Sequence, residues 1–453
     1  MKNKILAYKE HLKNPNLIAV VIAIFTTGFL RLQLIGYPPA SDGGYHSFAS
    51  QWIFNALSQG EVIKDSKLFL YTFMTSWVYG LEVNQIIMLR IIDGFVAIAA
   101  SIVLFKVILR ESGSKLFTVI LMVPLLIILH NFIYVLYGFR NPIWASYLAL
   151  FSALLISQKS SKDSNFSFYL IGALVSLGVL LREAFLPFSI LAGIAIYIAY
   201  SWHALTKYLI GSAVLGISVI SFMLIFRGWD LQNLIDTYFL HVDAYRDYPQ
   251  MGLSFSSGIL HLIQTGWFVC ALSIASILYF IKLNFNDKEP KDTNRFYFWI
   301  LVALLPLIEP IFKLGFHYHY SNCLIGLAGL SALCWNYLSL QESGKIKKSS
   351  IILIGLVCLF VALPTFNSKF IKIERIIMPS DAISLASNPE SFRNTRVIES
   401  SQYLTLAAKI YSLSREDSTL ATSGLMQVLH PLTNLLPPTY ELSWLRYLYV
   451  KVN

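Results

Sequence analysis

Charged side chains are scarce in this sequence. Lysine, arginine, aspartate and glutamate make up 13% of the 453 residues, whereas hydrophobic residues make up 56% and the mean hydropathy is +0.61. Soluble domains carry roughly 25% charged residues. The composition therefore excludes an ordinary water-soluble domain and predicts an integral membrane protein.

Cysteines are few, and sequence repeats are missing. No repeat of solenoid length and no low-complexity stretch is present. The net charge of +10 comes from short basic groups between apolar runs, without a nucleic-acid-binding motif, so no nucleic-acid partner is expected. The cysteines lie within apolar runs and none forms a CxxC pair, which argues against a disulfide framework or a cysteine metal site. They are Cys270, Cys323, Cys334 and Cys358.

Long apolar runs recur through the sequence up to residue 365. A helix needs about 20 apolar residues to cross a bilayer, so we expect an all-α polytopic membrane protein with about eleven transmembrane helices. The first run is expected to be an uncleaved span, because it is long and no small-residue cleavage site follows it. The predicted spans are 17–35, 85–108, 116–137, 142–157, 167–181, 185–201, 208–226, 258–282, 296–312, 320–338 and 350–365.

Basic residues between these spans predict the topology. If the N-terminus is cytoplasmic, every loop on the cytoplasmic side contains lysine or arginine, as the positive-inside rule expects. The chain is then a multi-pass protein of the cell (inner) membrane whose segment from about residue 366 lies on the extracytoplasmic, or periplasmic, side. The basic groups lie in 2–13, 106–115, 159–162, 207, 282–295 and 345–348.

Three parts of the chain are distinguished. Residues 1–365 form the predicted transmembrane domain, 36–84 its first external loop, and 366–453 a small extracytoplasmic segment of mixed α/β character. Within the loop we expect two helices lying on the membrane surface, over 46–58 and 68–81. The alternative for the second is a short span or half-span. The apolar stripe of the first helix consists of Phe48, Trp52, Ala56 and Leu57.

The polar turn "YPPASDGGYHSF", residues 37–48, follows directly after the first span. A carboxylate beside a membrane span is costly to bury and needs a partner, which makes Asp42 a functional candidate. Gly43 and Gly44 permit a close approach to the backbone. The structural alternative is that Asp42 only caps the following helix, since aspartate is a favoured N-cap residue.

The run "FLRLQLIGYPPASDGGYHSFASQWIFNALSQGE" resembles the first span and first external loop of the GT-C glycosyltransferases, especially the branch with protein O-mannosyltransferases and bacterial aminoarabinose transferases. The order of Arg31, Asp42, Tyr45 and an amphipathic helix is similar to theirs. Gly80 and Arg90 stand where that family has a glycine and a span-two arginine. The segments "LYGFRNPIWASYLALFSALL" and "GFHYHYSNCLIGLAGLSAL" resemble its fourth span and its late basic-aromatic loop.

This resemblance implies an inverting transfer of a sugar from a polyprenyl-phosphate donor to an acceptor. Asp42 would then accept the proton of the attacking hydroxyl, and cations would surround the lipid phosphate. Gly43 stands where family members often have a second acidic residue, so a divalent metal cofactor is left open. Candidates for donor phosphate and sugar binding are Arg140, Arg182, Lys313, His317 and His319, and candidates for acceptor contact or support are Tyr45, His46, Glu183 and Asp243.

Each of these residues also has a simpler interpretation. An arginine at a span end can be an interfacial side chain whose charge reaches the headgroups, and "FHYHY", 316–320, can be an aromatic belt. In "LLREAF", Arg182 and Glu183 interrupt an apolar stretch, which favours a function for them. His241 and Asp243 could bind a metal, but their spacing is weak evidence.

Two other classes of protein compete with the glycosyltransferase. An O-antigen-type polymerase or ligase also uses lipid-linked sugars, but such enzymes usually place arginine-rich loops in mid-chain. A lipid-linked sugar flippase or other transporter is expected to carry ionisable residues deep inside its spans. Most charges here lie at predicted span ends, with Glu309 the clearest exception. The acceptor class, whether glycan, lipid or protein, and the sugar are left open.

Overall fold

The computed structural model describes most of the first three quarters of the chain and short pieces of the rest. The span predicted over 350–365, nearly all of 366–453, and most of the loop 227–257 lie outside the described residues. The described residues are 14–32, 42–59, 64–65, 70–83, 85–130, 141–158, 165–227, 232, 254–286, 293–312, 317–341, 409–410, 412–415, 418 and 441–442.

The described part is almost entirely helical, as the sequence predicts. Four of its helices are long and apolar enough to cross a membrane: Pro15–Leu32, Gln85–Ser112, Trp202–Ile225 and Phe255–Leu278. Many large apolar side chains on these helices face outward. On the third of them Val214, Ile217 and Ile225 are 62–79% exposed, which suits contact with lipid chains. The shorter apolar helices are Lys115–Leu129, Ile143–Ser157, Phe166–Leu181, Glu183–Ala199 and Asn294–Leu307.

Two fully described connections, between α6 and α7 and between α10 and η3, are one or two residues long. The first predicted span is a single continuous helix with a π-helical turn in its middle, made of α2 (Pro15–Ala23), η1 (Ile24–Gly28) and α3 (Phe29–Leu32). The others are α4 (Asp42–Gln59), α5 (Leu70–Thr75), η2 (Ser76–Gly80), α6 (Gln85–Ser112), α7 (Lys115–Leu129), α9 (Asn141–Ser157), α10 (Asn165–Leu181), η3 (Glu183–Phe185), α11 (Leu186–Ala199), α12 (Trp202–Arg227), α14 (Phe255–Asn286), α15 (Thr293–Leu304), η4 (Leu305–Leu307), α16 (Ile308–Phe312), α17 (His317–Ser321) and α18 (Cys323–Gln341).

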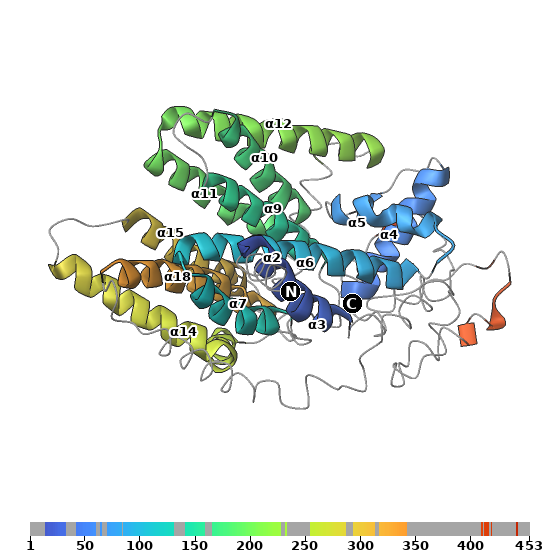
Figure 1. Cartoon of the computed structure of the whole chain (residues 1–453). Coiled ribbons are helices and arrows are strands. Elements are labelled where there is room, and N and C mark those ends of the chain that lie inside the picture. The colour runs from blue at the N-terminus through green and yellow to red at the C-terminus, as the bar shows by residue number, and fades with distance from the viewer. Residues whose placement is uncertain are drawn as a thin grey trace, which may run out of the picture.

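Helix α6 runs through the middle of the bundle (Figure 1). It packs against α2, α7, α9 and α18, while α10 and α12 pack tightly against each other beyond α9. The bundle has two ends. The first-loop end carries α4, α5 and the start of α6, and the far end carries the end of α6 together with the ends of α9 and α11 and the start of α15. Figure 1 shows the first-loop end at the right.

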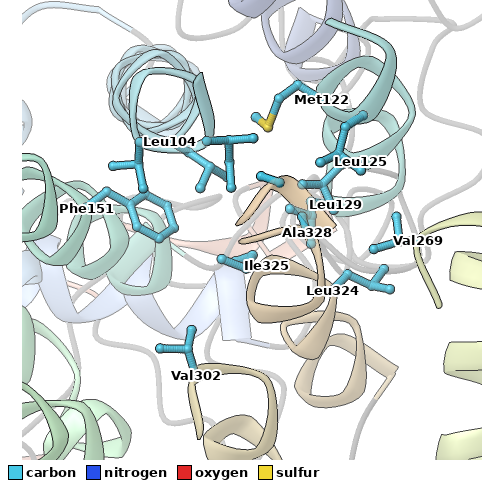
Figure 2. Packing of buried hydrophobic residues seen from close by; sticks show 14 of the residues in the cluster. Leu104, Met122, Leu125, Leu129, Phe151, Val269, Val302, Leu324, Ile325 and Ala328 are labelled. Atoms are coloured by element: carbon cyan, nitrogen blue, oxygen red, sulfur yellow. The ribbon is translucent and has the colours of Figure 1, made fainter. Parts of the chain in front are cut away.

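The apolar core lies where α6, α7, α9, α14, α15 and α18 meet. Leu104 of α6, Leu125 of α7 and Leu324 of α18 are fully buried there (Figure 2). Helices in a membrane gain little from hydrophobic burial against one another, so close packing has to hold them together. A side chain on Gly172 of α10 or Gly211 of α12 would overlap the backbone of the opposite helix.

The two segments of the first external loop that were predicted to be helical are helical, and their place on the membrane surface stays a prediction. Helix α4 buries Phe48, Trp52 and Ala56 on one face, as predicted, against α5 and η2. The predicted helix 68–81 is two short pieces, α5 and η2, and not one continuous helix. A Cβ on Gly80 would lie 3.0 Å from the ring of Phe54, so the glycine permits this contact. Residues Lys64–Asp65 (β1) pair in parallel with Glu441–Leu442 (β2).

Candidate functional site

Three charged or ionisable side chains meet inside the bundle near its first-loop end. Arg31 of α3 donates from Nη1 to Oδ2 of Asp93 in α6 at 2.7 Å, across 62 residues of sequence. Arg31 is 5% exposed and Asp93 1% exposed. An ion is costly to bury in an apolar medium, so each side chain depends strongly on the other.

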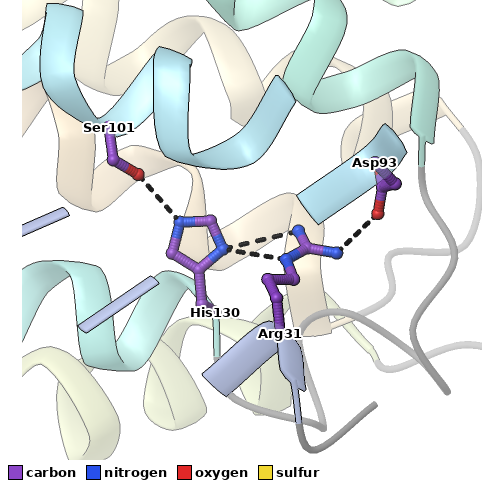
Figure 3. A network of polar contacts seen from close by, with 4 residues as sticks. All are labelled: Arg31, Asp93, Ser101 and His130. Carbon is purple, nitrogen blue, oxygen red and sulfur yellow. Dashed lines mark hydrogen bonds and ion pairs between the residues drawn. The ribbon is translucent and has the colours of Figure 1, made fainter. Parts of the chain in front are cut away.

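His130, directly after α7, extends this pair into a network (Figure 3). Arg31 donates from Nε and Nη2 to Nδ1 of His130, each at 3.4 Å. A guanidinium only donates, so Nδ1 accepts and the ring proton lies on Nε2, which contacts Ser101 Oγ at 3.2 Å. The hydroxyl of Ser101 donates to the carbonyl of Ala97 (2.8 Å). Each hydrogen bond from Arg31 through His130 and Ser101 to the Ala97 carbonyl therefore has one donor and one acceptor.

Two further side chains border the network. Arg90 lies one turn before Asp93 on α6 and is 4% exposed, and its charge acts on the Asp93 carboxylate. Tyr71 of α5 is also buried, and its environment includes the charges of Arg31 and Asp93. Burial, together with the nearby Asp93, raises the pKa of Tyr71 well above its usual value, so its phenol stays neutral. We call these five residues, Arg31, Tyr71, Arg90, Asp93 and His130, the buried cluster.

The buried cluster has more positive than negative charge. Among the described residues it contains two guanidinium groups and one carboxylate, with a neutral histidine and a neutral tyrosine. The ring of Trp144 in α9 packs against it, stacking on His130 at a centroid distance of 4.1 Å. The Arg31 guanidinium lies 5.9 Å from the Trp144 ring centroid. Net positive charge in such a buried environment favours an anionic group nearby.

The local sequence explains why these side chains converge. On α6, Arg90, Asp93, Ala97 and Ser101 recur at helical spacing and line one face. In the first span, Thr27 and Arg31 lie one turn apart and meet that face, with Thr27 Oγ1 2.9 Å from Ser101 Oγ. The π-helical turn Ile24–Gly28 contains Thr27 and precedes Arg31, and π turns inside helices are frequent at functional sites.

The first external loop lies against the buried cluster. Tyr71 belongs to α5, and α5 also packs on α4, where Ser50 Oγ lies 3.4 Å from both the carbonyl oxygen of Thr72 and the hydroxyl of Thr75. Helix α4 begins at Asp42, so the predicted catalytic aspartate opens the helix that packs on α5, which contributes Tyr71 to the cluster. The structure describes the backbone of Asp42, Tyr45 and His46 but not their side chains.

Of the predicted donor-site residues, Arg182 and His319 have described side chains. Arg182 and Glu183 form the turn between α10 and α11, where Arg182 is half-buried and Glu183 exposed. Leu180 and Leu181, just before this turn, pack with Tyr71, so the turn lies at the first-loop end. His319 is buried in α17, which packs against α7, α14 and α18. Arg140, Lys313 and Asp243 lie outside the described residues, as does the side chain of His317.

The sequence interpretation missed Asp93 and His130. Asp93 had a usable signal, because it lies one turn after Arg90 inside an apolar run, and two such charges in a candidate span indicate a buried partner. His130 had none, since a single histidine at the end of a run is common. Among the described residues there is no group of three histidine, cysteine, aspartate or glutamate side chains able to hold a metal.

No protein-family model matches the sequence, and no curated protein matches it.

Proposed function

We propose that this chain is an integral membrane glycosyltransferase, transferring a hexosyl or pentosyl group from a polyprenyl-phosphate donor to an extracytoplasmic acceptor with inversion at the anomeric carbon. The observation that carries the proposal is the buried cluster. It contains net positive charge at the end of the bundle where α4 begins with Asp42. Its Arg31 and Arg90 are also the two arginines on which the resemblance to the GT-C glycosyltransferases rests.

The proposed reaction needs a base and an anion site. The oxygen of an acceptor hydroxyl attacks the anomeric carbon, and the bond from that carbon to the phosphate oxygen breaks. The electron pair leaves with the polyprenyl phosphate, and the hydroxyl proton passes to the carboxylate of Asp42. Negative charge builds on the phosphate in the transition state, so nearby guanidinium groups lower the barrier.

Within this mechanism the residues have different roles. Asp42 is the proposed catalytic base. Arg31 is held by Asp93 and His130 in a fixed orientation, and with Arg90 it supplies the positive field near the phosphate. Arg182 at the α10–α11 turn adds a further cation at the same end. Asp93 and His130 act as positioning residues, because they orient Arg31.

The proposal includes a topology of about eleven spans, with the N-terminus cytoplasmic and residues 366–453 forming a small extracytoplasmic domain. Support comes from the basic groups of the sequence, which fall at the far end of the described bundle: Arg110 at the end of α6, Lys115 at the start of α7 and Arg295 at the start of α15. The pairing of Lys64–Asp65 with Glu441–Leu442 brings the first external loop and the C-terminal segment together.

One observation favours a second function, transport of a lipid-linked sugar. Arg90 and Asp93 lie within a helix able to cross a membrane, and buried ionisable groups in spans are typical of transporters. Both residues lie in the first third of this helix, however, within about 12 Å of its start at 1.5 Å per residue. A position near one membrane face suits an interfacial enzyme better than a central transport site.

The decisive variant is Asp42→Asn. Asparagine retains the size and much of the helix-capping ability of aspartate but removes the basic carboxylate. We expect the variant to fold and bind donor but to lose on the order of 100-fold or more in transfer rate. The measurement is sugar transfer by protein purified in lipid, from a panel of polyprenyl-phosphate sugars, with thermal stability and donor binding measured in parallel.

The matched control is Glu82→Gln, which removes an exposed carboxylate from the same external loop. It should transfer sugar at the normal rate. Near-normal turnover by Asp42→Asn would show that Asp42 is only a helix cap. Absence of turnover with every donor, combined with translocation of lipid-linked sugars by the wild type in proteoliposomes, would favour the transporter.

A further inference from the structure

A cavity of about 750 Å³ lies near the far end of the bundle, away from the buried cluster. Its wall is mostly apolar and includes Phe151 of α9, Leu191 of α11 and Val302 of α15. The volume falls in the range of roughly 300 to 1,000 Å³ that ligand-binding cavities occupy. The cavity is therefore large enough to accept an apolar ligand.

The rim of this cavity at the far end is polar and basic. Arg295 donates from Nη2 to Oε2 of Glu111 at 2.6 Å, and Gln158 donates to Oε1 of the same carboxylate. Arg110 donates to a neutral partner, the carbonyl oxygen of Leu155, at 2.9 Å. Both arginines are exposed, Arg295 by 44% of its side chain. The described rim thus contains two guanidinium groups against one carboxylate.

The cavity also borders the outer surface of the bundle. Large apolar residues of α11 and α15 line it and are exposed at the same time: Ile194 by 50%, Ile198 by 56% and Tyr297 by 57%. In a bundle that also contains membrane-spanning helices, such exposed apolar surfaces suit contact with lipid chains. A ligand can therefore reach the cavity sideways from the membrane.

We propose that the cavity binds an anionic phospholipid from the leaflet at the far end, with one acyl chain between α11 and α15 and its phosphate at Arg110 and Arg295. A basic pocket between transmembrane helices on the cytoplasmic side is a recognised setting for anionic lipid headgroups. Arginine can donate two parallel hydrogen bonds to a phosphate. The apolar wall and the opening toward the membrane favour a lipid over a soluble anion, because a soluble anion has no apolar chain to place in the cavity.

This lipid site is separate from the proposed donor site. Along α6, Asp93 and Arg110 are 17 residues apart, or about 26 Å at 1.5 Å per residue. That distance is close to the thickness of a bilayer core of about 30 Å, so the two sites face opposite leaflets. The proposal therefore does not depend on sugar transfer.

The test uses purified full-length protein in detergent micelles. It is titrated with phosphatidylglycerol, with phosphatidylcholine of the same acyl chains, and with glycerol 3-phosphate, and bound lipid is followed by native mass spectrometry and thermal unfolding. We expect phosphatidylglycerol to bind about tenfold more tightly than phosphatidylcholine, because both lipids carry the phosphate but the choline group adds a positive charge that the two arginines repel. Glycerol 3-phosphate should give no thermal shift.

Two variants remove the two halves of the site. Arg110→Gln should weaken phosphatidylglycerol binding about tenfold and phosphatidylcholine binding less, because the variant loses a phosphate contact in both lipids but also loses the repulsion of choline. Ala195→Phe, which places a ring inside the cavity, should weaken both lipids. The matched controls are Lys115→Gln, which removes an exposed cation at the same end, and Ala213→Phe, which adds a ring on the exposed surface of α12. Both should bind lipid like the wild type.

Three outcomes would overturn the proposal. Equal binding of the two lipids by the wild type would remove the headgroup assignment. A thermal shift with glycerol 3-phosphate alone would indicate a site for a soluble phosphate. Wild-type lipid binding by Ala195→Phe would place the lipid outside the cavity. This variant tests whether the lipid occupies the cavity even if Arg110→Gln fails to fold.

Discussion

At the scale of single residues, Asp93 is the side chain on which the buried cluster depends most. It is the carboxylate that accepts from Arg31 and also lies one turn from Arg90. Removing one partner of a buried ion pair leaves the other charge without compensation, which typically costs about 3 to 5 kcal/mol. Replacing both partners costs much less than the sum, because no charge is then stranded.

A double-mutant cycle on Arg31 and Asp93 tests this dependence. We expect Asp93→Asn and Arg31→Gln each to lower stability by about 3 kcal/mol or more, and the double variant to lose clearly less than the two losses added. Thermal or denaturant unfolding in detergent measures all four proteins. The control Lys115→Gln neutralises an exposed cation and should change stability by less than about 0.5 kcal/mol. Strict additivity would mean that the two side chains do not stabilise each other.

The sequence predicted this cluster only in part. Arg31 and Arg90 were found through the order of a family motif, but the pairing of Arg31 with Asp93 joins residues 62 positions apart. Such a contact depends on the helix crossing that brings the first span onto α6, and no local pattern encodes that crossing. The role of His130 was not predicted for the same reason. Its partners Arg31, Ser101 and Trp144 belong to three other segments.

At the scale of helices, close crossings depend on glycine. Gly172 and Gly211 let α10 and α12 touch backbone to backbone, where a Cβ would overlap the main chain around Tyr208 or Tyr169. Gly326 of α18 meets the backbone at Ala303 of α15 in the same way. These contacts bring backbone atoms within van der Waals range, which is the main source of association between helices in lipid.

The variant Gly172→Ala should therefore destabilise the α10–α12 pair. Its new methyl group forces the two backbones apart, and overpacking of this kind costs about 1 to 3 kcal/mol. The matched control is Gly216→Ala on α12, where the nearest atom is the Ser176 hydroxyl at 3.2 Å and a small side-chain movement suffices. Thermal unfolding of the two variants in the same detergent gives the comparison. Equal stabilities would show that the crossing has room to relax.

Helix positions were the part of the fold that the sequence predicted best. The apolar runs at 85–108 and 142–157 correspond to α6 and α9 within four residues, and the run 208–226 corresponds to α12, which begins six residues earlier. The run 296–312 corresponds to α15, η4 and α16, because Pro306 lies in a 3₁₀ turn that interrupts the α-helix. The run 68–81 is similarly divided into α5 and η2. Periodicity reports burial, but it does not report such changes of helix type.

At the scale of the whole molecule, the two bundle ends differ in charge and chemistry. The far end carries Arg110, Lys115 and Arg295, and the first-loop end carries the buried cluster with α4 and α5 packed beside it. The orientation proposed from the positive-inside rule has the far end in the cytoplasm. In that orientation the proposed transfer site opens to the other side of the membrane.

Cysteine labelling tests this orientation. In a variant without Cys270, Cys323, Cys334 and Cys358, single cysteines at Ser380 and Ser414 should react with a membrane-impermeant reagent while the inner membrane is intact. A cysteine at Lys115 should react only after that membrane is opened, and so serves as the matched internal control. Protection of both Ser380 and Ser414 positions in intact membranes would overturn the eleven-span topology, because an even number of spans would place the tail inside.

The π-helical turn in the first span determines how this segment tolerates changes in length. A π turn closes with one residue more than an α turn, so the helix can lose a residue between Ile24 and Gly28 and become regular without turning its two halves relative to each other. The exposed Phe25 is the natural residue to lose. Loss of a second residue before Arg31 would have no π turn left to absorb it and would turn Arg31 by about 100° relative to the start of the helix, away from Asp93. Among related chains, a gap of one residue at 24–28 is therefore compatible with the buried ion pair, and a gap of two residues is not.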